Sequence, residues 1–208
     1  MQKYDVVIVG AGIIGLSIAW QLARRSKLSI AVIEKGAGVG EGSTGASSAI
    51  CRVRYSVDET LLLARDGIQA YRHWGAFTRL ENPAADFHED GVLWMPGSDR
   101  DWADRELQRM KSFGVAAEVL DDNDIAERFP ALSTCTLAPD LDTGEAHICE
   151  GNSRNLFEVE GGHVDPMAAS TDLAEACRNA GVEVRFRTEV VGVGIGGDRI
   201  QSCLLYTS

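Results

Sequence analysis

The sequence has few cysteines and no closely spaced pair of them. Its five cysteines contain no C-x-x-C motif and are an odd number. A disulfide framework and a structural zinc site are therefore not expected, and the pattern favours the reducing cytoplasm. Histidine is also scarce, and no two histidines lie at a metal-ligand spacing, so we predict no metal site. We expect none of the four histidines to be catalytic: His73, His88, His147 and His163.

Positive charge is scarce as well. The chain carries 20 Lys and Arg residues against 31 Asp and Glu, a formal net charge of -11. This balance argues against nonspecific binding of nucleic acid or of anionic membranes, both of which need basic patches. The apolar stretch 6–19 is too short to span a bilayer and contains three glycines, so no membrane span is predicted. It also lacks the basic flank of a signal peptide, because Lys3 is offset by Asp5.

The N-terminal part of the chain instead shows the pattern of strand, turn, helix and strand. The segment Tyr4–Val9, which is apolar apart from Asp5, predicts a central parallel strand that is buried on both faces. Ile14, Ile18 and Leu22 recur at helical spacing and predict a helix. A second apolar run, Leu28–Ile33, predicts the next strand.

The turn between the first strand and the helix is Gly10-Ala11-Gly12-Ile13-Ile14-Gly15. In a dinucleotide-binding unit, Gly10 permits the tight turn, Gly12 lets a pyrophosphate approach the backbone, and Gly15 allows close packing of helix on strand. Glu34 ends the second strand about 20 residues further on, where a carboxylate accepts the ribose hydroxyls. The pattern predicts dinucleotide binding, and the alternative is a glycine-rich turn in an ordinary βαβ unit.

The residues after Glu34 favour FAD over NAD. An NAD domain would usually continue with alternating strands and helices. Here Lys35 is followed by the glycine-rich segment 36–42, by "GSTGASSAICRVRY" (42–55), and then by one predicted helix from Leu61 to Phe77. An NAD-dependent dehydrogenase that shares only the βαβ unit remains the alternative.

At this point the chain resembles a known family. The segments "DVVIVGAGIIGLSIAWQLARR", "VIEKG" and "GSTGASSAICRVRY" are similar to FAD-dependent amine oxidoreductases of the D-amino-acid oxidase group, in the branch of sarcosine oxidase, glycine oxidase and dimethylglycine dehydrogenase. The resemblance implies an α/β fold in which a Rossmann-like FAD-binding domain is interleaved with an α+β substrate domain. It also implies FAD-binding roles for a set of residues beyond the glycine motif: Glu34, Lys35, Ser43, Thr44, Ser47 and Val190.

The same resemblance bears on the substrate. An arginine that binds the substrate carboxylate in sarcosine oxidases falls on Arg52, and a family tyrosine falls on Tyr55. A guanidinium fork suits a carboxylate chemically. The alternative for Arg52 is a structural ion pair, which is the role that we predict for Arg54. Gly45 stands where the pattern has a histidine, so no covalent flavin–histidine bond is expected in this loop. Ala49 replaces the first family arginine, which leaves the amine substrate open.

The resemblance predicts a first FAD-binding part (1–80), a substrate-domain segment (81–160) and a return to the FAD-binding domain (161–202). Residues 203–208 form a fourth segment, which we predict to be a non-native tail. In the substrate segment, "GVLW" and "VAAEVL" predict strands, and helices are predicted from Trp102 and within "DDNDIAERF". Trp94 and Met95 are candidates for a pocket wall or for the core.

The return segment carries its own signals. Asp165 and Pro166 predict the start of a helix, and Gly196-Gly197-Asp198 predicts a hairpin turn. The chain then ends in "CLLYTS", and one codon choice for these residues matches a transposon-library adapter. We therefore hypothesise that residues 203–208 are not native and that the protein is truncated at its C-terminus.

The sequence thus predicts an enzyme that oxidises the C–N bond of an amino acid or N-methyl amino acid. Its partners would be FAD, a small amine substrate, and either oxygen or an electron-transfer protein as the acceptor. An inactive dinucleotide-binding fragment is the second alternative.

Overall fold

The computed structural model describes residues 3–96, 99, 101–134 and 154–207. The chain forms two compact units. The first unit contains Met1–Ile50, Ala70–Phe87 and Val164–Ser208, and the second contains Cys51–Gln69 and His88–His163. The first unit is therefore assembled from three stretches of chain, which are separated by the two stretches of the second unit.

A parallel sheet forms the centre of the first unit. Its strands β1 (Val6–Val9), β2 (Ile30–Ile33) and β9 (Glu183–Arg185) lie in the order β1-β2-β9. Helix α1 (Ile13–Arg25) connects β1 to β2, which confirms the predicted βαβ unit. The prediction that β1 is the strand buried on both faces was wrong for the described sheet. The buried central strand is β2, whereas β1 lies at the edge and Val9 is 67% exposed.

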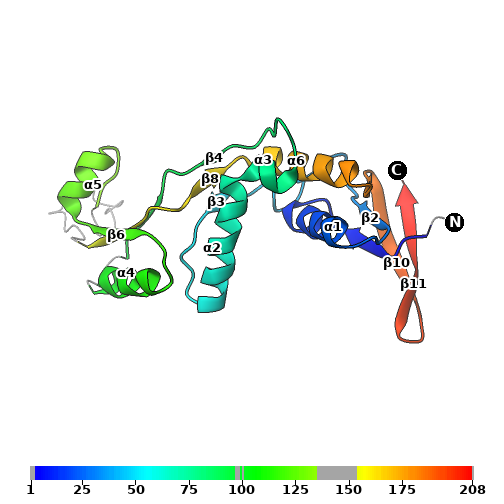
Figure 1. The fold of residues 1–208 in the computed structure, drawn as a ribbon, viewed down its shortest axis with the longest axis horizontal. Coiled ribbons are helices and arrows are strands. Elements are labelled where there is room, and N and C mark those ends of the chain that lie inside the picture. Colours follow the sequence, from blue (N-terminus) through cyan, green and yellow to red (C-terminus); the bar gives the residue numbers. More distant parts are fainter. Residues whose placement is uncertain (1–2, 97–98, 100, 135–153, 208) are drawn as a thin grey trace, which may run out of the picture. The chain divides into compact units, whose positions relative to one another are not determined.

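Helix α6 (Pro166–Asn179) packs against α1 in the first unit, as Figure 1 shows. The thiol of Cys177 lies 3.5 Å from the carbonyl oxygen of Leu16, so the contact involves the Leu16 side of α1. Helix α1 also contacts β1 and β2. Leu16, Ala19 and Trp20 are buried, whereas Ile14, which helped to predict the helix, is 74% exposed.

The start of α6 follows the sequence signals. The Asp165 carboxylate accepts hydrogen bonds from the backbone N–H groups of Met167 (2.7 Å) and Ala168 (2.9 Å), and Pro166 occupies the first helical position. The predicted N-cap is therefore confirmed. Short helix α3 (Trp74–Thr78) also belongs to this unit.

A long hairpin completes the first unit. Strands β10 (Thr188–Gly196) and β11 (Arg199–Thr207) pair antiparallel, and Gly197 has a φ of 63° in the turn between them. The predicted hairpin is confirmed, and Figure 1 shows the two strands as a twisted ribbon. Residues 203–207, which belong to the hypothesised tail, form the end of β11.

The second unit is an antiparallel sheet with two helices. Strands β5 (Val92–Trp94), β6 (Ala117–Leu120) and β7 (Asn155–Glu158) lie in the order β5-β7-β6. Helices α4 (Trp102–Ser112) and α5 (Asp122–Arg128) flank β6 in the sequence, as predicted. The unit has its own core of side chains that are almost inaccessible to solvent: Met110, Val115, Leu120, Ile125 and Leu156.

Four further elements lie where the chain passes between the units: β3 (Ile50–Cys51), α2 (Asp58–Arg72), β4 (Phe87–His88) and β8 (Gly162–Val164). The single helix predicted from Leu61 to Phe77 is two helices, because the backbone leaves the helical region at His73 (φ -120°, ψ 42°). Within the described ranges, no helix has the length and hydropathy needed to cross a membrane.

Candidate functional site

The glycine-rich turn of the first unit has the geometry that its sequence predicts. Gly10 has a φ of 103°, a conformation that side chains disfavour, and its N–H donates to the Ile33 carbonyl at 2.8 Å. A Cβ atom on Gly15 would overlap the carbonyl oxygen of Gly10. Glycine at both positions therefore lets α1 start directly against the end of β1.

The N-terminus of α1 presents polar groups in one place. Gly12 is the N-cap residue, and no side chain of the helix caps it. The N–H of Ile13 donates to the hydroxyl of Thr44 at 3.1 Å, and a Cβ on Gly12 would lie only 2.9 Å from that hydroxyl oxygen. Exposed N–H groups at a helix N-terminus, together with a hydroxyl, are suited to binding phosphate oxygens.

Glu34 lies beside this turn, at the carboxyl end of β2. Its carboxylate accepts hydrogen bonds from the backbone N–H groups of Ala11 (2.8 Å) and Gly36 (2.7 Å). The Glu34 side chain is thus held at the turn by two neutral donors that a ribose hydroxyl could replace.

A cavity of about 240 Å³ opens at the same edge of the sheet. It lies at the carboxyl ends of β1 and β2, where ligands bind in open α/β sheets. Four of its lining residues are ones that the sequence analysis assigned to FAD, namely Gly10, Glu34, Lys35 and Val190. The other four are Val9, Ile33, Thr188 and Glu189. The residues present therefore fit the adenosine half of a dinucleotide. The other four residues lie within two positions of predicted ones in the sequence, so only this proximity could have identified them as cavity-lining residues from the sequence.

The remaining predicted loop residues are outside the lining of this cavity. Ser43 is exposed, and the hydroxyl of Ser47 accepts a hydrogen bond from Ala49 N–H at 3.0 Å. Gly45 has a structural reason for lacking a side chain, because a Cβ there would lie 2.6 Å from the Gly40 carbonyl oxygen. A histidine at position 45 would disrupt this turn.

The second unit brings together a cluster of cationic and aromatic side chains. The Arg52 guanidinium lies 4.8 Å from the ring centre of Tyr55 and 5.1 Å from that of Trp94. The Arg54 guanidinium lies 5.0 Å from Trp94 and 4.9 Å from Trp102. The two predicted site residues Arg52 and Tyr55 are therefore neighbours, and Trp94 contacts both arginines.

The two arginines differ in their ionic partners. Arg54 forms an ion pair with Glu106 of α4 at 3.1 Å, and both side chains are largely buried. This confirms the structural ion pair predicted for Arg54. Among the described residues, no carboxylate lies within ion-pair distance of Arg52, whose contacts are the two aromatic rings.

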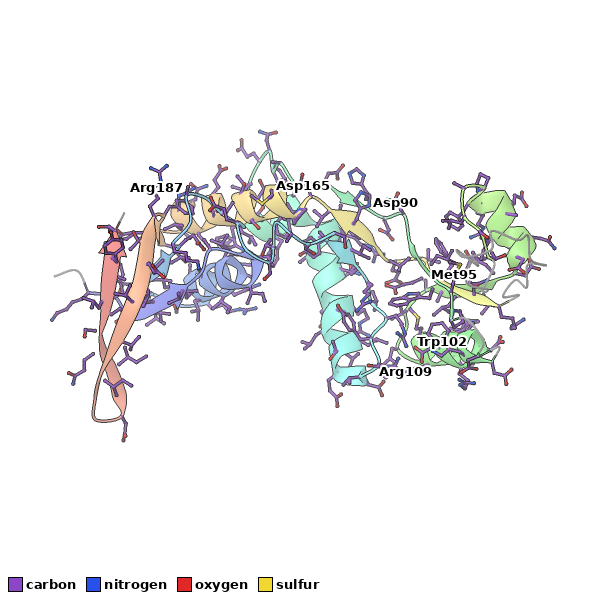
Figure 2. The ribbon with its side chains drawn as sticks, turned by 180° about the vertical axis from the view of Figure 1, so that it is seen from behind. Asp90, Met95, Trp102, Arg109, Asp165 and Arg187 are labelled. Atoms are coloured by element: carbon purple, nitrogen blue, oxygen red, sulfur yellow. The ribbon has the colours of Figure 1, made fainter. Side chains whose placement is uncertain are left out.

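Arg109 supports the same cluster from α4, where Figure 2 labels it together with Trp102. Its guanidinium binds Glu106 at 3.1 Å and Asp58 at 2.6 Å. It also donates to the backbone carbonyl of Tyr55 at 2.8 Å, which fixes the chain just after Arg52.

Sequence reasoning missed a buried carboxylate in this unit, Glu158 at the end of β7. The residue is 0% exposed, and its oxygens accept hydrogen bonds from Val53 N–H, from Arg54 N–H (3.1 Å) and from the indole of Trp94 (3.3 Å). Burial raises the pKa of the Glu158 carboxyl, and these donors together with the charge of Arg52 only partly offset this effect. Position 158 carries no motif, so only its tertiary contacts reveal it.

The histidines do not form a comparable site. His163 pairs with Asp90 at 2.9 Å and stacks on His88, and His73 is an exposed residue between α2 and α3. His147 lies outside the described residues. In the part of the chain that the structure describes, no group of three or more metal-binding side chains occurs.

Comparison with known families decides between the cofactors. The family model described as FAD dependent oxidoreductase (DAO) matches residues 5–203, nearly the whole chain. The chain belongs to this family. FAD is the family's cofactor, and the match favours it over the nicotinamide alternative.

Individual members of the DAO family show the same relationship. The chain is 25% identical to the sarcosine oxidase subunit beta of Rhodobacter capsulatus over 202 residues, which cover 96% of this chain and 45% of that protein. It is 28% identical to the glycine oxidase of Bacillus licheniformis over 197 residues, which cover 92% of this chain and 47% of that protein. The chain thus spans about half the length of the curated relatives that it matches.

Solved structures share the fold. The L-proline dehydrogenase of P. horikoshii superposes with a TM-score of 0.81 at 21% identity, over 98% of this chain and 49% of that one. A glycine oxidase from Bacillus cereus superposes with a TM-score of 0.75, also at 21% identity, over 98% of this chain and 51% of that one. These likenesses confirm the α/β fold expected from the sequence.

Proposed function

We propose that this protein is an FAD-dependent oxidoreductase that oxidises the C–N bond of an amino acid or N-methyl amino acid. Membership of the DAO family supports the reaction type, and relatives named as sarcosine and glycine oxidases support the substrate class. The observation that carries the cofactor assignment is the cavity at the ends of β1 and β2, which is lined by Glu34 and Val190.

The first unit would hold FAD as a Rossmann-like domain does. Glu34 would accept the ribose hydroxyls in exchange for part of its bonds to Ala11 and Gly36. The N-terminus of α1 and the Thr44 hydroxyl would contact the pyrophosphate, while Val190 would lie against the adenine. Lys35, Ser43 and Ser47 remain proposed contacts of the cofactor.

The second unit would bind the substrate. Arg52 would pair with the carboxylate of the amino acid, because its guanidinium has no competing carboxylate among the described residues. Tyr55 would hold the guanidinium plane in place through its ring. Bound FAD supplies the two-electron acceptor for a hydride from the α- or N-methyl carbon of the amine. Oxygen or an electron-transfer protein would be the final acceptor, and the cysteine pattern supports a cytoplasmic location.

Flavin binding by the purified protein tests the cofactor assignment. We expect a yellow protein with an absorption band at about 450 nm. Glu34→Ala should weaken FAD binding at least about tenfold, because it removes a charge-assisted pair of hydrogen bonds. The matched control is Glu175→Ala, which removes an exposed carboxylate of α6 and should leave FAD binding unchanged. Binding of NAD in place of FAD, or equal FAD affinity in the two variants, would contradict the assignment.

A further inference from the structure

Glu158 is a buried charged group that the proposed function leaves without a role. A carboxylate that is fully removed from water is costly unless hydrogen bonds compensate it. Its partners are the backbone N–H groups of Val53 and Arg54 and the indole N–H of Trp94. Three donors from two different segments therefore converge on one side chain.

Two of these donors belong to the segment that carries Arg52. Glu158 binds two successive N–H groups with its two oxygens, which restrains the backbone immediately after Arg52. The Val53 side chain between the two arginines is itself fully buried. The position from which the Arg52 side chain extends is thus fixed by a carboxylate on β7.

The third donor orients the aromatic ring against which Arg52 lies. The Trp94 indole donates to Glu158 at 3.3 Å, and the same ring lies 5.1 Å from the Arg52 guanidinium. Arg54 also contacts Trp94, but Glu106 neutralises it. Glu158 attracts Arg52 electrostatically, yet its hydrogen bonds go to Val53, Arg54 and Trp94. The guanidinium donors of Arg52 consequently remain available for an external carboxylate.

We propose that Glu158 is a positioning residue for substrate binding, which holds the 53–54 backbone and Trp94 so that the Arg52 guanidinium is presented to the substrate carboxylate. This inference rests on the proposed role of Arg52. It assigns to Glu158 an effect on carboxylate affinity that general stabilisation of the second unit would not produce.

The test measures acetate binding to the FAD-loaded protein by calorimetry, with acetamide as the uncharged control ligand. Glu158→Gln keeps one acceptor oxygen but places an amide N–H₂ against a backbone donor, so the segment loosens. We expect acetate affinity to fall about tenfold, with acetamide binding unchanged. Glu118→Gln is the matched control, because it removes a carboxylate of the same unit that pairs with Arg128 and not with a residue of the Arg52 segment. It should leave acetate affinity unchanged.

The variant Arg52→Ala distinguishes a failure of the role proposed for Arg52 from a failure of the role proposed for Glu158. If Arg52→Ala leaves acetate affinity unchanged, or if the unsubstituted protein binds no acetate, the proposed role of Arg52 is wrong and the inference fails with it. If Arg52→Ala weakens acetate binding but Glu158→Gln does not, only the role of Glu158 is wrong. The double variant should bind acetate as weakly as Arg52→Ala alone, since Glu158 acts through Arg52. An additive loss would overturn the inference. Glu158→Asp, which keeps the charge, should recover part of the affinity.

Discussion

The buried carboxylate of Asp172 provides a quantitative test of what holds the first unit together. Asp172 lies on α6 and is 3% exposed. It accepts hydrogen bonds from the indole of Trp74 (2.8 Å) and from the backbone N–H groups of Ala84 (2.9 Å) and Ala85 (2.8 Å). These bonds join α6 to α3 and to the loop that follows it.

Asp172→Ala would leave these donors without an acceptor. The Trp74 and Ala85 donors are buried, whereas Ala84 is exposed and its N–H can bond to water instead. An unsatisfied buried donor costs about 1–3 kcal/mol. We therefore expect Asp172→Ala to lower the free energy of unfolding of the first unit by about 3 kcal/mol, which is the loss of two buried hydrogen bonds to a charged group.

Asp165→Ala is the matched control, because Asp165 caps the same helix and also accepts hydrogen bonds from backbone N–H groups, but in an exposed position. Loss of such an N-cap costs about 1 kcal/mol. Urea titrations followed by hydrogen–deuterium exchange of α6 peptides measure both variants, with peptides of the second unit as the internal reference. Equal losses in the two variants would refute the reasoning that burial makes the Asp172 bonds stronger.

Two further predictions concern a close contact and a thiol. Gly15→Ala places a Cβ against the Gly10 carbonyl and should abolish soluble expression or flavin binding. Gly67→Ala lies on an open face of α2 and should instead raise the free energy of unfolding by about 0.5–1 kcal/mol, measured by thermal unfolding. A soluble, flavin-binding Gly15→Ala protein would show that the close approach is not required. Burial raises the pKa of the Cys51 thiol from 9.0 to about 11. The neutral thiol therefore prevails at pH 8, and the fraction of reactive thiolate rises only as the pH approaches 11. Iodoacetamide should label Cys51 at pH 8 about 100-fold more slowly in the native than in the urea-unfolded protein, and equal rates would contradict this.

Local patterns predicted the elements of the first unit well, because their signals lie within a few residues. The glycine turn, the N-cap at Asp165 and the hairpin at Gly197 each depend on neighbouring residues, and the structure confirms all three. Burial was less predictable. Val9 and Ile14 are apolar but exposed, because the neighbours that cover a strand or helix are determined by tertiary packing and not by the run itself.

Polar contacts between distant segments were not predictable at all. Asp172 reads as an ordinary helix-surface residue in the sequence, and its indole partner Trp74 lies 98 residues earlier. No periodicity links two such positions. The same limitation applies to the cavity, where Glu34 and Val190 meet at the ends of different strands. There the family resemblance, and not the pattern of the residues, supplied the expectation.

Arg52 and Arg54 show how tertiary contacts give different roles to similar neighbours. Both guanidinium groups lie against the same Trp94 ring, so aromatic packing alone does not distinguish them. The distinction comes from carboxylates far along the chain, since Arg54 is paired by Glu106, 52 residues away, while its backbone N–H is bound by Glu158, 104 residues away. An arginine that is neutralised within its own unit has little remaining affinity for an external anion, whereas one supported by rings and a restrained backbone keeps its donors available. The proposed division between a structural and a substrate-binding arginine therefore follows from where Glu106 and Glu158 lie in the fold.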